Sequence, residues 1–338
     1  MNLLENVSLK PYNTFGIDVS AKYFSTFTTI EQLQAILENK DLNALPRLIL
    51  GGGSNMLFTK DFDGIVLRNR IPGIEVVEED SAHWYVKSGA GVLWHDQVLW
   101  CIERGYQGIE NLSLIPGTSG AAPIQNIGAY GVELKDTFFQ LEAIDLTTGK
   151  LVVYNKEACD FGYRQSVFKS DLKGKVIITS VTLALRKKPE YNVSYGAITQ
   201  ELSKMGVESP DAKSISQAVV KIRQSKLPDP AKIGNAGSFF KNPEVSASQF
   251  ELLHKSFPDM VSYPLPDGNY KLAAGWLIEQ CGWKGKVVGN TGSHKDQALV
   301  LVNYGNATGN EIRDLAYRIL DSVKERFGVA IEPEVNII

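Results

Sequence analysis

Two glycine-rich segments contain the residues whose types best suit ligand binding. The first glycine segment, Gly51-Gly-Gly-Ser-Asn55, follows an apolar stretch at 46–50, and the second glycine segment covers residues 115–131. Glycines allow successive backbone N–H groups to converge on an anion without side-chain collisions, and Ser54 and Asn55 add polar donors. The first segment therefore suits a phosphate, although three glycines after a strand also suit an ordinary turn.

The first glycine segment is not a common nucleotide-binding motif. The chain continues with the apolar Met56-Leu-Phe58, so neither G-x-G-x-x-G with a capped helix nor the Gly-Lys-Ser/Thr of a Walker loop is present. In the second segment, Gln125 and Asn126 stand among small residues. An amide pair there could hydrogen-bond the edge of a heteroaromatic ring whose face lies on glycine and alanine backbone. The small residues could also simply pack a tight crossing between elements.

The bulk composition is that of an ordinary globular protein. The 338 residues include 35 basic and 38 acidic side chains, for a formal net charge of −3, and 43% are hydrophobic. No basic arm indicates nucleic-acid binding, although a local basic cluster could still hold one anionic ligand. Cys101, Cys159 and Cys281 are odd in number and far apart, which favours a reducing compartment over a disulfide framework.

The sequence predicts neither a metal site nor a membrane segment. The histidines, His83, His95, His254 and His294, are scattered without ligand spacing, and we expect His294 to be solvated. No apolar run has the length that spans a bilayer, and residues 1–10 lack the pattern of a secretory signal. We therefore expect a cytoplasmic protein that binds neither metal nor membrane.

Hydrophobic spacing predicts an irregular alternation of strands and helices. The predicted strands cover 46–50, 64–67, 84–88, 140–145, 176–185, 297–303 and 329–331, and the predicted helices cover 30–37, 96–104, 215–222 and 312–327. Capping boxes are expected before the first helix, at Thr28 and Glu31, and before the last, at Thr308 and Glu311. This order favours an α+β fold over a doubly wound parallel sheet.

The two glycine segments, in this order and about sixty residues apart, resemble those of the UDP-N-acetylenolpyruvoylglucosamine reductase family. The resemblance continues through nearly the whole chain, in blocks at 13–16 (NTFG), 161–169 (FGYRQSVFK), 226–230 (KLPDP), 234–243 (GNAGSFFKNP) and 332–335 (EPEV). The departures are small. Ser119 stands where the family often has a small apolar residue, and Asn336 stands where a basic residue is common.

The resemblance implies that the cofactor is FAD and that NADPH is the reductant. It places the FAD pyrophosphate at the first glycine segment and the isoalloxazine ring around the second. The implied FAD contacts are Gly51, Gly52, Gly53, Ser54, Asn55, Pro116, Gly117, Ser119, Gly120, Ile124, Gln125, Asn126, Gly128 and Ala129.

The resemblance also assigns the reaction chemistry. Reduction of an enol ether conjugated to a carboxylate needs a hydride at the terminal carbon, stabilisation of an enolate-like intermediate, and a proton at the adjacent carbon. By resemblance, Ser238 donates the proton, Arg164 holds the substrate carboxylate and the growing enolate charge, and Glu334 reaches the enolpyruvyl group. Taken singly, each of the three is typical of a turn or of the protein surface.

Four further residues are implied to hold the UDP-sugar: Tyr195, Lys226, Asn242 and Gln297. Lys226 would meet the diphosphate as a point charge, and Tyr195 would close over the nucleotide from a loop. The presence of Tyr195 with its surrounding segment is typical of the subgroup that carries an extra tyrosine loop.

The implied function is NADPH-dependent, FAD-mediated reduction of UDP-N-acetylglucosamine enolpyruvate to UDP-N-acetylmuramate by a monomer, a step in peptidoglycan precursor synthesis. An FAD-dependent oxidase or dehydrogenase of the same flavin fold, acting on an alcohol or aldehyde, is the alternative. A nucleotide-binding protein without turnover is a second alternative.

The implied fold is α+β, with a two-subdomain FAD-binding fold (PCMH-type) and a smaller C-terminal α+β substrate-binding domain. The first FAD-binding subdomain is expected at 1–66 together with 329–338, and the second at 67–225. The substrate-binding domain is expected at 226–328, where the Pro-rich run that begins at Lys226 marks its start.

Overall fold

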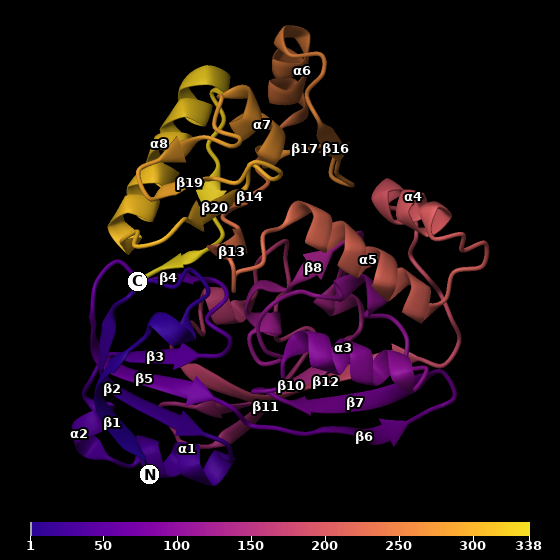
Figure 1. Ribbon diagram of the computed structural model, residues 1–338. Helices are drawn as coiled ribbons and strands as arrows, with labels where there is room; N and C mark the ends of the chain where they lie inside the picture. The colour runs from indigo at the N-terminus through magenta and orange to yellow at the C-terminus, as the bar shows by residue number, and fades with distance from the viewer. Residues whose placement is uncertain (1) are drawn as a thin grey trace. The chain divides into compact units, whose positions relative to one another are not determined.

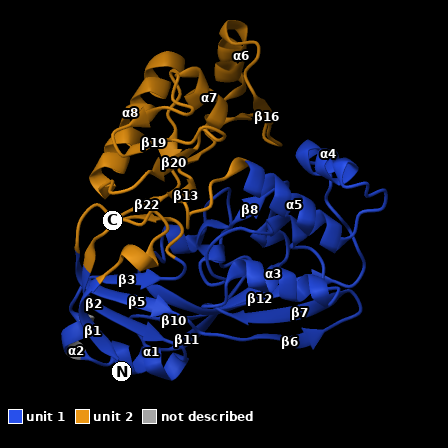
Figure 2. Ribbon diagram, viewed as in Figure 1, with its two compact units in different colours: residues 1–7, 21–52, 62–225 blue, residues 8–20, 53–61, 226–338 orange. Residues whose placement is uncertain are grey.

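The computed structural model describes residues 2–338, which form two compact units (Figure 1, Figure 2). Unit 1 comprises residues 1–7, 21–52 and 62–225, and unit 2 comprises residues 8–20, 53–61 and 226–338. The chain leaves unit 1 and enters unit 2 within the first glycine segment, since Gly52 belongs to unit 1 and Gly53 to unit 2. The three-domain division expected from the sequence remains a prediction.

The first sheet of unit 1 ends at the first glycine segment. Its strand order is β1-β2-β5-β3, formed by Leu3–Ser8, Ser20–Phe27, Phe62–Asn69 and Arg47–Leu50. β2 and β3 both pair in parallel with β5, so the chain needs a crossover between them, and it supplies α1 (Ile30–Leu37) and α2 (Lys40–Asn43). Apolar residues of α1 are buried against β2 and β5, which fixes the position where β3 ends.

The N-terminus of α1 differs from the prediction by one residue. The N-cap is Thr29, whose hydroxyl accepts from the N–H of Gln32 at 3.2 Å, and Gln32 Oε1 accepts from the N–H of Thr28 at 2.8 Å. The predicted box of Thr28 with Glu31 is wrong: the helix begins one residue later, in a register that buries Leu33 and Ile36, and Gln32 accepts from Thr28 rather than from the N-cap Thr29, so no capping box is closed.

The second sheet of unit 1 is antiparallel and carries a helix on one face. Its order is β11-β10-β12-β7-β6, formed by Leu151–Asn155, Phe138–Asp145, Val176–Arg186, His83–Gly89 and Ile74–Glu79. Trp94 and Val98 of α3 (Trp94–Glu103) belong to one buried core with Val181 and Leu183 of β12. Figure 1 shows α3 beside β7 and β12. The second glycine segment lies in this part of the chain, with a 3-10 turn at Ala122–Gln125 and a short hairpin of β8 (Gly128–Ala129) and β9 (Val132–Glu133).

Two helices complete unit 1. α4 (Gly196–Lys204) and α5 (Ala212–Lys226) bury Ile198, Ile215 and Val219 in a small core, and Tyr130 of the second glycine segment packs against it. The helix predicted near 215–222 is confirmed as part of α5. The core therefore holds α5 beside the end of that segment.

Unit 2 is built on a second antiparallel sheet and one long helix. The sheet has the order β13-β20-β19-β18, formed by Gly234–Ser238, Val300–Asn303, Thr291–Ser293 and Val287–Val288. α8 (Gly309–Phe327) packs on β19 and β20 with the apolar face that the sequence predicts, and its capping box of Thr308 and Glu311 is confirmed. The remaining elements are β15 (Glu244–Val245), α6 (Ala247–Ser256), β16 (Ser262–Pro264), β17 (Tyr270–Leu272) and α7 (Ala274–Gln280).

The C-terminal residues return to the N-terminal part of unit 2. β22 (Asn336–Ile337) pairs in parallel with β4 (Met56–Leu57), and β21 (Glu332–Pro333) pairs with β14 (Phe240–Lys241). The strand predicted at 329–331 lies instead at 332–333, because β21 pairs with the strand that follows Ser238. The predicted α+β class is confirmed. No helix in the described part of the chain combines the length and apolar character needed to cross a membrane.

The capping box of α8 leads to a stability prediction. Thr308→Ala removes the hydroxyl that accepts from Glu311 N at 3.2 Å and donates to Glu311 Oε2 at 2.8 Å. We expect the free energy of unfolding to fall by about 1 kcal/mol, as for other N-cap substitutions, with the change read from urea denaturation. Asn310→Ala, at an exposed position of the same turn, is the control, and equal effects of the two substitutions would contradict the prediction.

Candidate functional site

The two glycine segments lie directly against each other in unit 1. A Cβ atom at Gly52 would lie 3.0 Å from the Cα of Gly117, and a Cβ at Gly51 would lie 2.6 Å from Thr118 Oγ1. The second segment also lies against residues at the end of β7, because a Cβ at Gly120 would approach the Cβ of Ala90 to 2.4 Å. We call Gly51, Gly52, Gly117 and Gly120 the glycine cradle, whose close packing leaves no room for larger side chains.

Backbone hydrogen bonds fix the second glycine segment in place. The N–H of Ser119 donates to the carbonyl of Val92 at 2.8 Å, and the N–H of Gly120 donates to that of Ala90 at 3.0 Å. The N–H of Trp94, the first residue of α3, donates to the carbonyl of Gly117 at 3.0 Å. The segment is therefore an ordered part of the core, which is what a rigid binding surface requires.

Some side chains of the second segment serve the protein itself. Ser119 is fully buried, and its hydroxyl donates to Gln97 Oε1 at 2.6 Å. The amide of Asn126 donates to the carbonyl of Gly162 at 3.0 Å and to Glu133 Oε2 at 3.1 Å, and it accepts from the N–H of Lys135 at 3.0 Å. The side-chain amide of Asn126 is therefore occupied by partners within the chain, and its backbone N–H donates to the carbonyl of Pro123 at 3.3 Å.

Ile124 differs from its neighbours because it is a large apolar side chain that remains 38% exposed. It occupies the 3-10 turn whose first residues, Ala122 and Pro123, are buried. An apolar side chain held at the surface of an ordered turn suits contact with a flat ring. The two predicted contacts at Ile124 and Gln125 lie on this turn, and both stay predictions.

Backbone strain gathers around the second segment and Arg164. Leu114, Asn126, Tyr130 and Arg164 have φ angles of 57°, 43°, 51° and 54°, in the left-handed region. Each such conformation costs of order 1–3 kcal/mol for a residue other than glycine, and it persists only where its surroundings hold it. Strained residues of this kind are typical of functional sites, which supports the sequence interpretation of this region.

Arg164 is held at the end of the second glycine segment. Its Nη2 donates to the carbonyl of Gly128 at 2.8 Å, and its own carbonyl accepts from Lys169 Nζ at 3.2 Å. Both contacts come from residues of the sequence blocks that carry the resemblance. The structure thus brings the predicted catalytic Arg164 together with the predicted cofactor contact Gly128.

Tyr195 also reaches the second glycine segment. It precedes α4, it is 42% exposed, and its ring packs edge-on against the ring of Tyr130 with centroids 5.3 Å apart. Asn192 supports this approach by donating to the carbonyl of Gly131 at 3.0 Å. The loop that carries Tyr195 is thereby tied to the segment that is predicted to surround the flavin.

Arg223 is a residue that the sequence interpretation missed. It lies on α5 three residues before Lys226, and its Nε donates to the carbonyl of Leu114 at 3.1 Å. Burial lowers the pKa of Arg223, and the nearby Arg164 lowers it further, while the Tyr130 hydroxyl opposes the shift. An isolated arginine on a helix gives no sequence signal, because the partners that matter here are distant in the chain.

In unit 2 the structure brings Ser238 and Glu334 together. Ser238 ends β13 and pairs with Val300 directly after a bulge between Asn235 and Ser238, and it is half-buried. The N–H of Glu334, also half-buried, donates to the carbonyl of Phe239 at 2.7 Å, beside Ser238. Gly237, which precedes Ser238, has φ 69°, a backbone conformation that favours glycine, so the chain turns immediately before Ser238.

Asn242 and Gln297 meet at the N-terminus of α7. Asn242 Oδ1 accepts from the N–H of Ala274 at 2.9 Å, and a Cβ at Gly275 would lie 3.3 Å from Gln297 Oε1. Lys226, the fourth predicted substrate residue, is exposed at the last residue of α5. Asn242 therefore caps a helix, which leaves its amide nitrogen for a ligand.

The expectation for His294 is wrong. This histidine is only 7% exposed. Its backbone N–H donates to the carbonyl of Val300 at 2.8 Å, and its ring atom Nδ1 accepts from the backbone N–H of Asp296 at 3.3 Å. Burial lowers the pKa of His294. The loop predicted at His294-Lys-Asp-Gln297 is confirmed, since these residues lie in the connection between β19 and β20. Within residues 2–338, no cluster of three or more His, Cys, Asp or Glu side chains could hold a metal ion.

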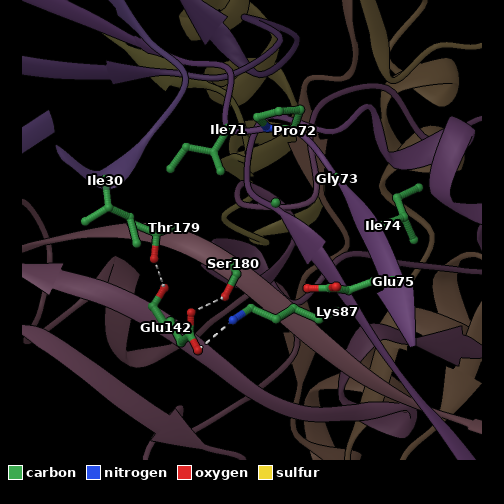
Figure 3. Close-up of a pocket in the computed structure, with 11 residues that line it drawn as sticks. Ile30, Ile71, Pro72, Gly73, Ile74, Glu75, Lys87, Glu142, Thr179 and Ser180 are labelled. Carbon is green, nitrogen blue, oxygen red and sulfur yellow. Dashed lines mark hydrogen bonds and ion pairs between the residues drawn. The ribbon is translucent and has the colours of Figure 1, made fainter. Parts of the chain in front are cut away.

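A cavity of about 380 Å³ in unit 1 is not part of the candidate site (Figure 3). Ile30, Ile71 and Pro72 form its apolar wall. On its polar side, Glu142 accepts from Lys87 Nζ at 2.8 Å and from Ser180 Oγ at 2.9 Å. The residues predicted to hold cofactor and substrate do not line this cavity.

Comparison with known proteins supports a flavin enzyme. Residues 229–338 match the family model described as UDP-N-acetylenolpyruvoylglucosamine reductase, C-terminal domain, and residues 21–155 match the model of an FAD binding domain. The chain is similar to UDP-N-acetylenolpyruvoylglucosamine reductases of Amoebophilus asiaticus, at 53% identity over 338 residues, and Flavobacterium johnsoniae, at 51% identity over 340 residues. Each alignment covers all of this chain and all of the relative.

One similar solved structure is that of UDP-N-acetylenolpyruvylglucosamine reductase from Thermus caldophilus. It matches with a TM-score of 0.70 and 26% identity, and the match covers 100% of this chain and 99% of that chain. The similarity therefore extends over the FAD-binding part and the C-terminal part alike.

The close packing of the glycine cradle predicts that one methyl group added at Gly120 lowers the FAD content of the protein. Gly120→Ala places a Cβ against the Cβ and the backbone of Ala90, neither of which can move aside easily, so the second segment must shift. We expect the purified variant to retain less than a tenth of the wild-type FAD, measured as visible absorbance per mole of folded protein. Gly196→Ala, where a Cβ meets nothing within 4 Å, is the control. Full FAD content in Gly120→Ala would contradict the cradle.

Proposed function

The chain belongs to the UDP-N-acetylenolpyruvoylglucosamine reductase family, and from this premise we propose that it reduces UDP-N-acetylglucosamine enolpyruvate to UDP-N-acetylmuramate. It is an FAD-containing oxidoreductase that acts on small molecules, with NADPH as the reductant. The reaction is a step in peptidoglycan precursor synthesis. The protein acts as a monomer in the cytoplasm.

One observation carries the cofactor assignment. The glycine cradle is a close backbone packing of two segments, held by hydrogen bonds, inside the part of the chain that matches an FAD binding domain. Backbone N–H groups presented by glycine suit a pyrophosphate, and a surface of glycine, alanine and Ile124 suits a flat ring. The residues present therefore fit FAD. When bound, FAD supplies the hydride that it has received from NADPH.

Ser238 donates the proton that completes the reduction. It follows Gly237 at a bulge of β13, and the backbone hydrogen bond from Glu334 to Phe239 holds the residue that comes after it. A hydroxyl is a weak acid, so it serves only a strongly basic carbon, which is what an enolate-like intermediate offers. The backbone of Glu334 is bonded to Phe239, the residue after Ser238, and its side chain reaches the enolpyruvyl group.

Arg164 holds the substrate carboxylate and the charge that grows on the enolate. Its guanidinium is anchored through Nη2 to the carbonyl of Gly128, so its position relative to the second glycine segment is fixed. A planar guanidinium suits two carboxylate oxygens, and a fixed donor needs no reorganisation when charge develops.

The UDP-sugar is held by Tyr195, Lys226, Asn242 and Gln297. Tyr195 offers an exposed ring on a loop that is tied to the second segment, and Lys226 offers an exposed ammonium to the diphosphate. Asn242 and Gln297 present amides at one helix end. The oxidase or dehydrogenase acting on an alcohol or aldehyde is not favoured, because the full-length relatives are reductases of this family.

The role of Ser238 is tested by separating the two half-reactions. In Ser238→Ala, reduction of bound FAD by NADPH is expected to stay within twofold of wild type, while reoxidation by the enolpyruvyl nucleotide slows by about 10²- to 10⁴-fold, the usual contribution of a general acid. Anaerobic stopped-flow absorbance measures both rates. Ser256→Ala, at an exposed position of α6, is the control. Equal slowing of both half-reactions would remove the assigned role.

The role of Arg164 is tested with a substitution that keeps its charge. Arg164→Lys loses the planar fork, so we expect kcat for the enolpyruvyl nucleotide to fall by about 100-fold, in line with the loss of one donor to developing charge. FAD content should be unchanged. Arg313→Lys, on the surface of α8, is the control. Unchanged kcat in Arg164→Lys would refute the assignment.

A further inference from the structure

The cavity of unit 1 that Figure 3 shows has the size and the apolar wall of a small-molecule site. Its volume of about 380 Å³ falls within the range of ligand pockets, roughly 300–1,000 Å³. Ile30 of α1, Ile71 and Pro72 after β5, and Ile74 of β6 form the apolar wall, and the three isoleucines are only half-buried. An apolar ligand that lies against this wall would therefore remove further hydrophobic surface from water.

The polar side of the cavity has one more carboxylate than ammonium groups. In the strand register Glu75 of β6 lies opposite Lys87 of β7, but the Lys87 ammonium instead bonds Glu142 of β10 at 2.8 Å. Glu142 also accepts from Ser180 Oγ at 2.9 Å. The exposed carboxylate of Glu75 forms no hydrogen bond or ion pair with any part of the chain that the structure describes, and it points toward the other lining residues (Figure 3). The lining therefore carries one net negative charge.

The cavity is separate from the glycine cradle, although the two are neighbours along the backbone. Thr179 lines the cavity, and its carbonyl accepts from the N–H of Ala90 at 2.9 Å. The carbonyl of Ala90 accepts in turn from the N–H of Gly120 in the cradle, at 3.0 Å. None of the residues assigned to FAD or the UDP-sugar lines the cavity. A ligand in the cavity would therefore contact a different set of side chains.

We propose that this cavity binds a small organic cation, a primary ammonium group on a short apolar chain. The carboxylate of Glu75 receives the ammonium group, because Lys87 already neutralises Glu142, and the apolar wall holds the chain. A carboxylate beside an apolar wall favours such a cation over a neutral molecule of the same shape and repels an anion. Neither FAD nor the enolpyruvyl nucleotide takes part in this binding.

The test compares three probes of matched chain length. Hexylamine, which is a cation at neutral pH, is titrated into purified holoenzyme beside the neutral hexanol and the anionic hexanoate, and ligand-observed NMR measures each dissociation constant. Hexylammonium is expected to bind with a dissociation constant of about 1 mM or lower, which a ligand of this size permits. Hexanol and hexanoate are expected to bind at least about fivefold more weakly, as for the loss of one partly exposed charge pair.

Two substitutions test the carboxylate. Glu75→Gln changes an exposed side chain, so the protein should fold normally, and hexylammonium is expected to bind it no more tightly than hexanol binds the wild type. Glu78→Gln removes another exposed carboxylate of β6 that does not line the cavity, and its affinity for hexylammonium is expected to stay within twofold of wild type.

Four outcomes would overturn the proposal. Equal affinity for the three probes would show apolar binding alone, and unchanged affinity in Glu75→Gln would place the ammonium group elsewhere. Displacement of hexylammonium by the enolpyruvyl nucleotide would place the amine in the substrate site. The fourth outcome is the absence of binding at ten times the expected dissociation constant.

Discussion

The account of this protein depends on one close backbone contact, the packing of Gly51 and Gly52 against Gly117 and Thr118. A Cβ at Gly51 would displace the Thr118 hydroxyl, and a Cβ at Gly52 would press on the backbone of Gly117, so the close contact favours glycine where β3 ends. It joins the parallel sheet, which delivers the first segment, to the core under α3, which holds the second. Both sheets of unit 1 therefore serve to bring two segments together that are distant in the chain.

The surroundings of this contact combine backbone strain with two arginines of like charge. Leu114, Tyr130 and Arg164 hold left-handed backbone conformations, and the two arginines at 164 and 223 repel each other. Both features cost folding free energy, and the packing around them offsets that cost. A binding surface for an anionic, flat ligand is consistent with both features, because such strain is typical of functional sites and two arginines attract an anion.

The sequence predicted most of the elements and the parts of the site that depend on local pattern. The amphipathic face of α8, its capping box at Thr308 and the glycine segments could be read directly, since each is encoded within a few residues. Local pattern could not show that the Asn126 amide binds Gly162, that His294 is buried, or that Arg223 reaches Leu114. Those contacts join residues through the tertiary fold, and the polar side chains involved look like surface residues in sequence.

The most direct measurement of the central claim is a visible spectrum of the purified wild-type protein under anaerobic conditions. The account predicts the absorbance of bound oxidised flavin, its loss on addition of NADPH, and its return when UDP-N-acetylglucosamine enolpyruvate follows. A colourless protein that takes up no FAD on reconstitution would contradict the glycine cradle as a flavin site. A reduced flavin that the nucleotide fails to reoxidise would contradict the assigned reaction.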